Sequence, residues 1–171
     1  MKEIFQNLLW PAAAGNVAWS FFTLAIDKDW SSGDVAARLF ALFLLAIYLG
    51  VSWTIFDDKK NHDPFYWIMD GAHLITVVTF SIATQLGKDW LSISLLVLFS
   101  VTAFGHLCGA WHNKHNLKLS LTSFLGIVVV CGSTYIGIEE PYNLSLSIFL
   151  VLIAWGTVRF ILLPRIDADY A

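Results

Sequence analysis

The chain of 171 residues is 57% hydrophobic and only 13% charged, and its formal net charge is −3. Soluble domains carry about 25% charged residues, so this composition excludes a disordered chain and argues against a water-soluble domain. Because there is no long basic run, the sequence also gives no reason to expect nucleic acid as a partner.

Six apolar runs follow one another along the chain, each near the roughly 20 residues that cross the hydrocarbon core of a lipid bilayer. The first run is interrupted by Pro11 and Asn16 and lacks a small-residue cleavage site, so we do not expect it to be a cleavable signal peptide. Because the runs make up most of the chain, we predict a single transmembrane domain over residues 1–171, an all-α bundle of six helices. The predicted spans are about residues 8–26, 36–56, 66–86, 91–111, 119–138 and 144–163.

The lysines and arginines are unevenly shared between the two sides of the predicted bundle. About seven lie at the termini and near the connections after the second and fourth spans, against three on the opposite side. An excess of Lys and Arg marks the cytoplasmic side of a membrane protein. We therefore expect an inner or plasma membrane protein with both termini in the cytoplasm.

The three connections on the opposite side share a pattern. They read IDKDWSSGD, LGKDWLSIS and IEEPYNLSL, and each places a charged pair before an aromatic residue and serines before the next apolar run. A glycine follows late in each next span, at Gly50, Gly105 and Gly156. On these few identities, the pattern predicts one helical hairpin used three times. Such repeats are typical of transporters and channels, whose sites lie where the repeats meet.

Polar and ionisable residues gather at one depth in the predicted spans. Counted from the cytoplasmic ends at about 1.5 Å per residue, His73 lies about 9 Å deep and His106 about 7–8 Å deep. Ionisable side chains within a membrane face the interior of the bundle or an aqueous cavity by default. We expect this layer to line a pore or bind a ligand through Asn16, Ser52, Asp70, His73, His106 and Arg159.

Most of these residues also have a purely structural interpretation. Asp70 and His73 lie three residues apart on one helical face and can form a local hydrogen-bonded pair. His106 can bond to a neighbouring helix, and Arg159 can reach lipid headgroups. Asn16 can hold two helices together through a hydrogen bond.

The segment FGHLCGAWHNKH combines glycines and histidines. Gly105 and Gly109 form a G-x-x-x-G pair that lets another helix approach closely, and together with the segment CGSTYIG they lead us to expect a homo-oligomer. His112 and His115 lie where the run ends, beside a lysine, so a solvated connection is a stronger interpretation for them than a metal site.

Three functions are compatible with these six predicted site residues. The first is a channel or transporter for a small polar solute or ion, in which Asp70 and His73 form a constriction that senses pH, because histidine titrates near neutral pH. The second is a membrane redox protein in which His73 and His106, at matching depth on antiparallel helices, bind a haem or a divalent metal. The third is a structural or regulatory subunit that acts through helix contacts.

No motif in the sequence points to an enzyme. The chain contains no HExxH, no GxSxG and no repeated histidine box. Its two cysteines lie in apolar runs without CxxC spacing and predict free thiols. We therefore expect membrane transport, with the redox or metal function as the alternative.

Overall fold

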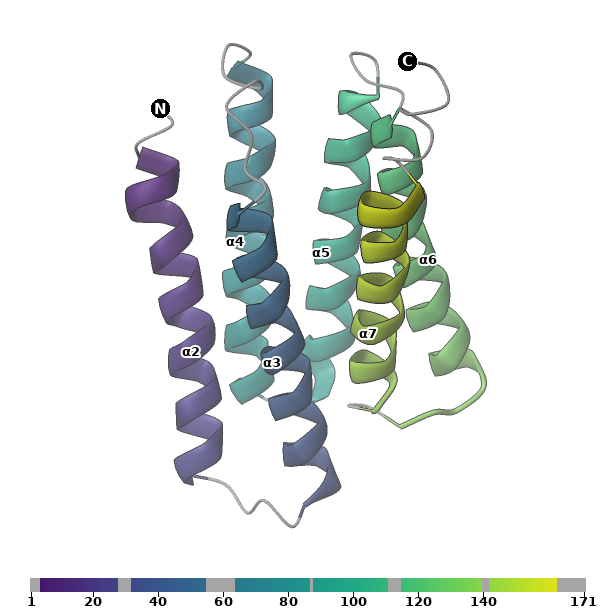
Figure 1. Ribbon diagram of the computed structural model, residues 1–171. Coiled ribbons are helices and arrows are strands. Elements are labelled where there is room, and N and C mark those ends of the chain that lie inside the picture. Colours follow the sequence, from purple (N-terminus) through teal and green to yellow (C-terminus); the bar gives the residue numbers. More distant parts are fainter. Residues whose placement is uncertain are drawn as a thin grey trace.

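The structure, a computed structural model, describes residues 4–27, 32–54, 64–86, 88–110, 115–139 and 142–162. These residues are almost entirely helical, and no strand occurs among them, which confirms the predicted all-α class (Figure 1). The elements are η1 (a π-helical turn, Phe5–Leu9), α2 (Trp10–Asp27), α3 (Gly33–Thr54), α4 (Pro64–Leu86), α5 (Lys88–Gly109), α6 (His115–Tyr135), α7 (Tyr142–Gly156) and η3 (a π-helical turn, Thr157–Leu162).

Each predicted span coincides with one segment that is long and apolar enough to cross a membrane, and every predicted end lies within five residues of the observed one. The largest differences are in α3. Its candidate span begins at Gly33 and not at residue 36, so that it includes the charged Asp34 in addition to Arg38. The six segments are Asn7–Ile26, Gly33–Val51, Trp67–Leu86, Trp90–Gly109, Asn116–Tyr135 and Tyr142–Leu162.

Local sequence explains how two of the helices begin and end. Pro64 is the first residue of α4, a position where its missing N–H costs no helical hydrogen bond. Beyond the end of α6, Gly137 has a positive φ of 77°, which a residue without Cβ adopts readily. The amides of Gly137 and Ile138 donate to the carbonyls of Thr134 and Ser133, and this pattern closes a helix C-terminus.

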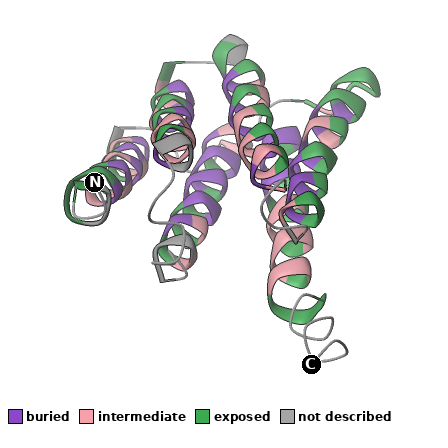
Figure 2. Cartoon of the chain, turned by 90° about the horizontal axis from the view of Figure 1, so that it is seen from above, coloured by how far each residue is buried: buried purple, intermediate pink, exposed green. Residues whose placement is uncertain are grey.

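The six long helices form a closed ring. We call the end of the bundle where α2 begins and η3 ends the terminal end, and the end where α2, α4 and α6 finish the hairpin end (Figure 1). In the ring, α2 packs against α3 and α4, and then α4 against α5, α5 against α6, α6 against α7, and α7 against α3. Buried residues lie on the faces that the helices turn toward one another, and exposed residues lie on the outer faces (Figure 2).

The ring order limits the form of the hairpin repeat. The pairs α2–α3, α4–α5 and α6–α7 each pack together, as three hairpins require. However, α4 follows α2 around the ring and has only a minor contact with α3, so the first hairpin is placed in the opposite sense to the other two. As a result, α2 and α4 are parallel neighbours, and so are α3 and α7. The bundle therefore has no threefold rotation, and the repeat stays a prediction from the sequence.

Polar side chains join neighbouring helices around the ring. A hydrogen bond of this kind helps to hold helices together where no water competes for the polar groups. Among these bonds are Ser81 to Asn16 between α4 and α2, Ser120 to the Ala103 carbonyl between α6 and α5, Ser133 to Asn143 between α6 and α7, and Ser145 to the Ala37 carbonyl between α7 and α3.

A buried arginine connects α3 to α4 near the hairpin end. The Nε atom of Arg38 lies 3.0 Å from the carboxylate of Asp34, and its Nη1 donates to the carbonyl of Thr84 over 2.8 Å. Thr84 lies in the last turn of α4, where carbonyl groups lack partners within the helix. A positive charge is favourable at that position because it opposes the helix dipole.

Candidate functional site

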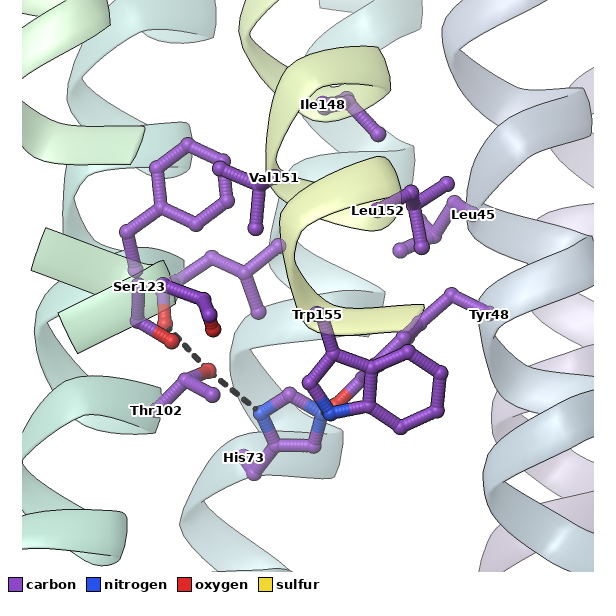
Figure 3. A pocket seen from close by; sticks show the side chains of 12 residues that line it. Leu45, Tyr48, His73, Thr102, Ser123, Ile148, Val151, Leu152 and Trp155 are labelled. Atoms are coloured by element: carbon purple, nitrogen blue, oxygen red, sulfur yellow. Dashed lines mark hydrogen bonds between the residues drawn. The ribbon is translucent and has the colours of Figure 1, made fainter. Parts of the chain in front are cut away.

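A small cavity lies inside the ring, and its wall includes residues from five helices, α3 to α7. Its volume is about 50 Å³. Tyr48, His73 and Thr102 form a polar group on one side of the wall, and aliphatic and aromatic side chains make up most of the rest (Figure 3). The other lining residues are Leu45, Leu98, Phe99, Thr122, Ser123, Ile148, Val151, Leu152 and Trp155.

His73 lies at the centre of the polar group and connects three helices. Its Nε2 atom lies 3.0 Å from the hydroxyl of Tyr48 in α3, and its Nδ1 atom lies 2.9 Å from the hydroxyl of Thr102 in α5. Thr102 in turn donates to the carbonyl of Leu98 over 2.7 Å (Figure 3). Both ring nitrogens are thus engaged by other helices, and neither bonds to Asp70, so the expected local pair of Asp70 and His73 is replaced by bonds between helices.

The packing of α4 against α5 explains this register. Gly105 has no side chain, and the Met69 side chain lies 3.4 Å from the place where a Cβ would be. One helical turn further toward the hairpin end, His73 meets Thr102. Gly105 therefore packs inside the bundle, and His106 lies about level with Met69, one turn away from His73.

Aromatic rings cover the polar group on the terminal side. The ring of Tyr48 meets the imidazole of His73 edge to face at a centroid distance of 5.5 Å, and it meets the indole of Trp155 at 5.7 Å. Phe160 in η3 packs against Trp155 at 5.9 Å. Edge-to-face contacts of this kind are the favourable geometry for aromatic pairs. These rings lie between the cavity and the terminal end of α7.

Two of the predicted site residues, Asp70 and His106, lie one helical turn from the cavity. Asp70 precedes His73 by three residues in α4, and His106 follows Thr102 by four residues in α5. Residues at this spacing lie on the same helical face. Both side chains are partly buried. The structure therefore places them on the terminal side of the cavity and not in its wall.

Two cations occupy similar positions on the neighbouring helices. Arg159 in η3 follows Trp155 by four residues and is partly buried. Lys118 in α6 precedes Thr122 by four residues and is exposed. We call Asp70, His106, Lys118 and Arg159 the polar layer.

Of the other two predicted site residues, Asn16 is not brought to the cavity. Asn16 accepts a hydrogen bond from Ser81 at the contact of α2 with α4, and α2 contributes no residue to the cavity wall. Its position agrees with the structural interpretation of helix attachment. Ser52 belongs to α3, but its side chain lies outside the described residues.

The geometry does not favour a haem or metal held by His73 and His106. Both nitrogens of His73 already have partners, and His106 lies one turn away. In the described part of the chain, no group of three or more His, Cys, Asp or Glu side chains could hold a metal ion. His112 and the side chain of His115 lie outside the described residues.

Sequence reasoning found His73 but missed its two partners. Tyrosine and threonine occur in many membrane helices, so neither residue type stands out. A weak signal was present in the spacing, because Tyr48 lies four residues before Ser52 and Thr102 lies four residues before His106. Each partner thus shares a helical face with a residue that was predicted.

Comparisons with protein-family models, with curated proteins and with solved structures found no match to this chain. Its function must therefore be argued from the bundle itself.

Proposed function

We propose that this protein transports a small polar solute or ion across a membrane, and that the structure represents a state closed toward the hairpin end. One observation carries the proposal. An ionisable side chain, His73, lies in the wall of a cavity inside a membrane-type bundle and bonds to two other helices. Ionisable groups at such positions are costly, and they typically mark the path of a substrate or ion.

The packing of the hairpin half supports the closed state. The largest apolar side chains with less than 2% exposure all lie on the hairpin side of His73. Close-packed cores leave few voids larger than a water molecule, so among the described residues no passage continues from the cavity to the hairpin end. These side chains are Val17, Leu42, Val77, Phe80, Leu91, Leu95, Val130 and Leu144.

The terminal half has a different character. Tyr48, His73, Thr102 and Trp155 are each only partly buried, and the polar layer follows one turn further out. Polar and charged groups that follow a cavity in this way are typical of an aqueous entrance. We therefore place the entrance of the transport path at the terminal end, which the distribution of Lys and Arg assigns to the cytoplasm.

The size of the cavity requires movement during transport. A cavity of about 50 Å³ holds only a few water molecules, because one water needs at least about 10–15 Å³ of such space. Mostly apolar walls of this size act as a constriction that closes by excluding water. The helices must separate before a larger solute can enter, and the bonds of His73 cross the helices that would have to move.

Purified protein in liposomes tests the proposal. The panel consists of glycerol and urea, measured by light scattering, and of potassium, chloride and protons, measured by electrodes and dyes. We expect flux of at least one of them above that of empty liposomes, and we expect His73→Ala to change its rate. Thr79→Val is the matched control, because Thr79 lies on the exposed face of the same helix and bonds only to its own backbone. Absence of flux for the whole panel would contradict transport.

We also propose that the protein forms a homo-oligomer, through CGSTYIG, one of the two glycine-containing segments expected from the sequence. Gly105 faces Met69 inside the bundle, whereas Gly132 in α6 is exposed and has open space around it. A helix surface with a small residue allows close approach of a second helix within the membrane. The mass of the protein in detergent, measured by light scattering, decides between monomer and oligomer.

A further inference from the structure

We propose that the ion coupled to this transport is a proton, that it binds at Nε2 of His73, and that it displaces the hydrogen bond donated by Tyr48. This inference rests on the proposed function and names the ion that acts at the same site. It follows from the direction in which each hydrogen bond of the polar group must run.

The direction is set at Thr102. A threonine hydroxyl has a single hydrogen to donate. Thr102 Oγ1 lies 2.7 Å from the carbonyl of Leu98, which can only accept, so the hydroxyl hydrogen belongs to that bond. The contact of 2.9 Å between Thr102 Oγ1 and His73 Nδ1 must then be donated by the imidazole. Nδ1 therefore carries a hydrogen.

The tautomer of neutral His73 follows from this assignment. A neutral imidazole carries one hydrogen, so Nε2 is an acceptor when Nδ1 is a donor. The hydroxyl of Tyr48, 3.0 Å from Nε2, must be the donor of that bond. The result is one directed chain of hydrogen bonds, from Tyr48 through His73 and Thr102 to the carbonyl of Leu98, which joins α3, α4 and α5.

Protonation interrupts this chain at one place. When Nε2 takes up a proton, both ring nitrogens become donors. The bond to Thr102 is unchanged, because Nδ1 already donates to it. The bond from Tyr48 must then reverse, since two hydrogens would otherwise point at each other: Nε2–H donates to the phenol oxygen, and the phenol turns its own hydrogen into the cavity. The imidazolium then donates to both α3 and α5, and the change that protonation makes is the release of the phenol hydrogen of Tyr48 into the cavity.

The surroundings of the imidazole leave room for this role. Besides Tyr48, no titratable side chain of the described residues is shown in contact with His73. The rest of the cavity wall on the other helices consists of Leu98, Phe99 and Thr102 in α5, Thr122 and Ser123 in α6, and aliphatic residues and Trp155 in α7. The nearest charged or titratable groups on its own and neighbouring helices are those of the polar layer, Asp70, His106, Lys118 and Arg159, about one turn toward the terminal end. We therefore assign the terminal end as the side from which the proton arrives.

The position of the hydrogen on neutral His73 is a first, transport-independent test. Nitrogen-15 NMR of labelled protein in lipid at alkaline pH reports which ring nitrogen is protonated. We expect hydrogen on Nδ1 in the natural protein and in Thr102→Ser, which keeps the hydroxyl. Thr102→Val removes the acceptor, so the hydrogen should move to Nε2 and bond to the oxygen of Tyr48. Hydrogen on Nε2 in the natural protein, or an unchanged spectrum in Thr102→Val, would overturn the proposal.

The coupling itself is tested with a solute from the liposome panel that is transported. A pH gradient should drive its accumulation by the natural protein, and His73→Gln, which bonds but does not titrate near neutral pH, should move it only down its own gradient. If the solute moves but a pH gradient has no effect, the proton proposal fails and transport stands. If nothing moves, transport fails, and the NMR result still decides whether the proton site exists.

Discussion

At Gly126, α6 approaches both of its neighbours closely. A Cβ at this position would lie 2.7 Å from the ring of Phe99 in α5 and 2.7 Å from Cγ2 of Val151 in α7. Both contacted residues line the cavity. The glycine is therefore needed to bring the two walls of the cavity together, and not for any unusual backbone conformation.

We predict that Gly126→Ala lowers the stability of the folded protein. Overpacking of a close contact costs about 1–3 kcal/mol, because the buried ring and the valine must both shift. Thermal unfolding in detergent should show a lower midpoint for this variant. Gly15→Ala in α2 is the control, since nothing lies near its Cβ and alanine favours a helix. Equal behaviour of the two variants would mean that α6 does not approach its neighbours in this way.

At the residue scale, the sequence predicts which ionisable side chain matters better than it predicts what that side chain touches. His73 stands out because a histidine inside an apolar run is costly. Its contact with Tyr48 joins positions 25 residues apart, and its contact with Thr102 joins positions 29 residues apart. These contacts depend on the register of three helices. Depths counted from predicted helix ends cannot give this register, because an error of four residues in a helix end already shifts the depth by about one turn, or about 5.4 Å.

Among the elements, α3 has the most unusual beginning. It enters the bundle with Asp34 and Arg38, and the arginine is 7% exposed. The pair is tolerated there because Arg38 also bonds to the last turn of α4, so its charge is satisfied from two directions. Hydropathy alone placed the start of this span too late, because it counts the charges and not their partners.

We predict that Arg38→Leu loosens the hairpin end by separating α3 from α4. Loss of the charged hydrogen bonds should cost about 1.5–3 kcal/mol. Arg38→Lys should lie between this variant and the natural protein, because lysine keeps the charge but lacks the second donor of the guanidinium. Thermal unfolding measures the cost, and proteolysis of membrane vesicles reports the exposure of the hairpin end. An unchanged midpoint for Arg38→Leu would show that the pair contributes no attachment between the helices.

The existence and limits of the helices could be predicted from the sequence, but their order around the ring could not. The spans follow from hydropathy because a helix in lipid has to be about 20 residues long. The order depends on which face of each helix is turned inward, and these helices expose large apolar residues on their outer faces as well, among them Trp19, Phe43 and Leu121. In lipid, an apolar face therefore does not mark the inside.

The whole molecule is divided into two halves of different packing. Toward the hairpin end, large side chains are fully buried, whereas toward the terminal end the partly buried polar group of Tyr48, His73 and Thr102 and the polar layer interrupt the core. A region with less packing opens more readily than a well-packed core. Access of water to the cavity should therefore come from the terminal end, whatever solute the protein carries.

Cysteine labelling tests this asymmetry. The natural Cys108 and Cys131, both free thiols, are first replaced by serine. We predict that Ser123→Cys, in the cavity wall, reacts with a small charged methanethiosulfonate reagent added on the side of the termini, and at least about tenfold more slowly from the other side, because only the loosely packed half opens readily. Ser133→Cys, buried in the hairpin half, should stay unmodified from both sides. Faster labelling of Ser123→Cys from the hairpin side would reverse the direction in which the path is closed, while the bundle and its bonds would remain as described.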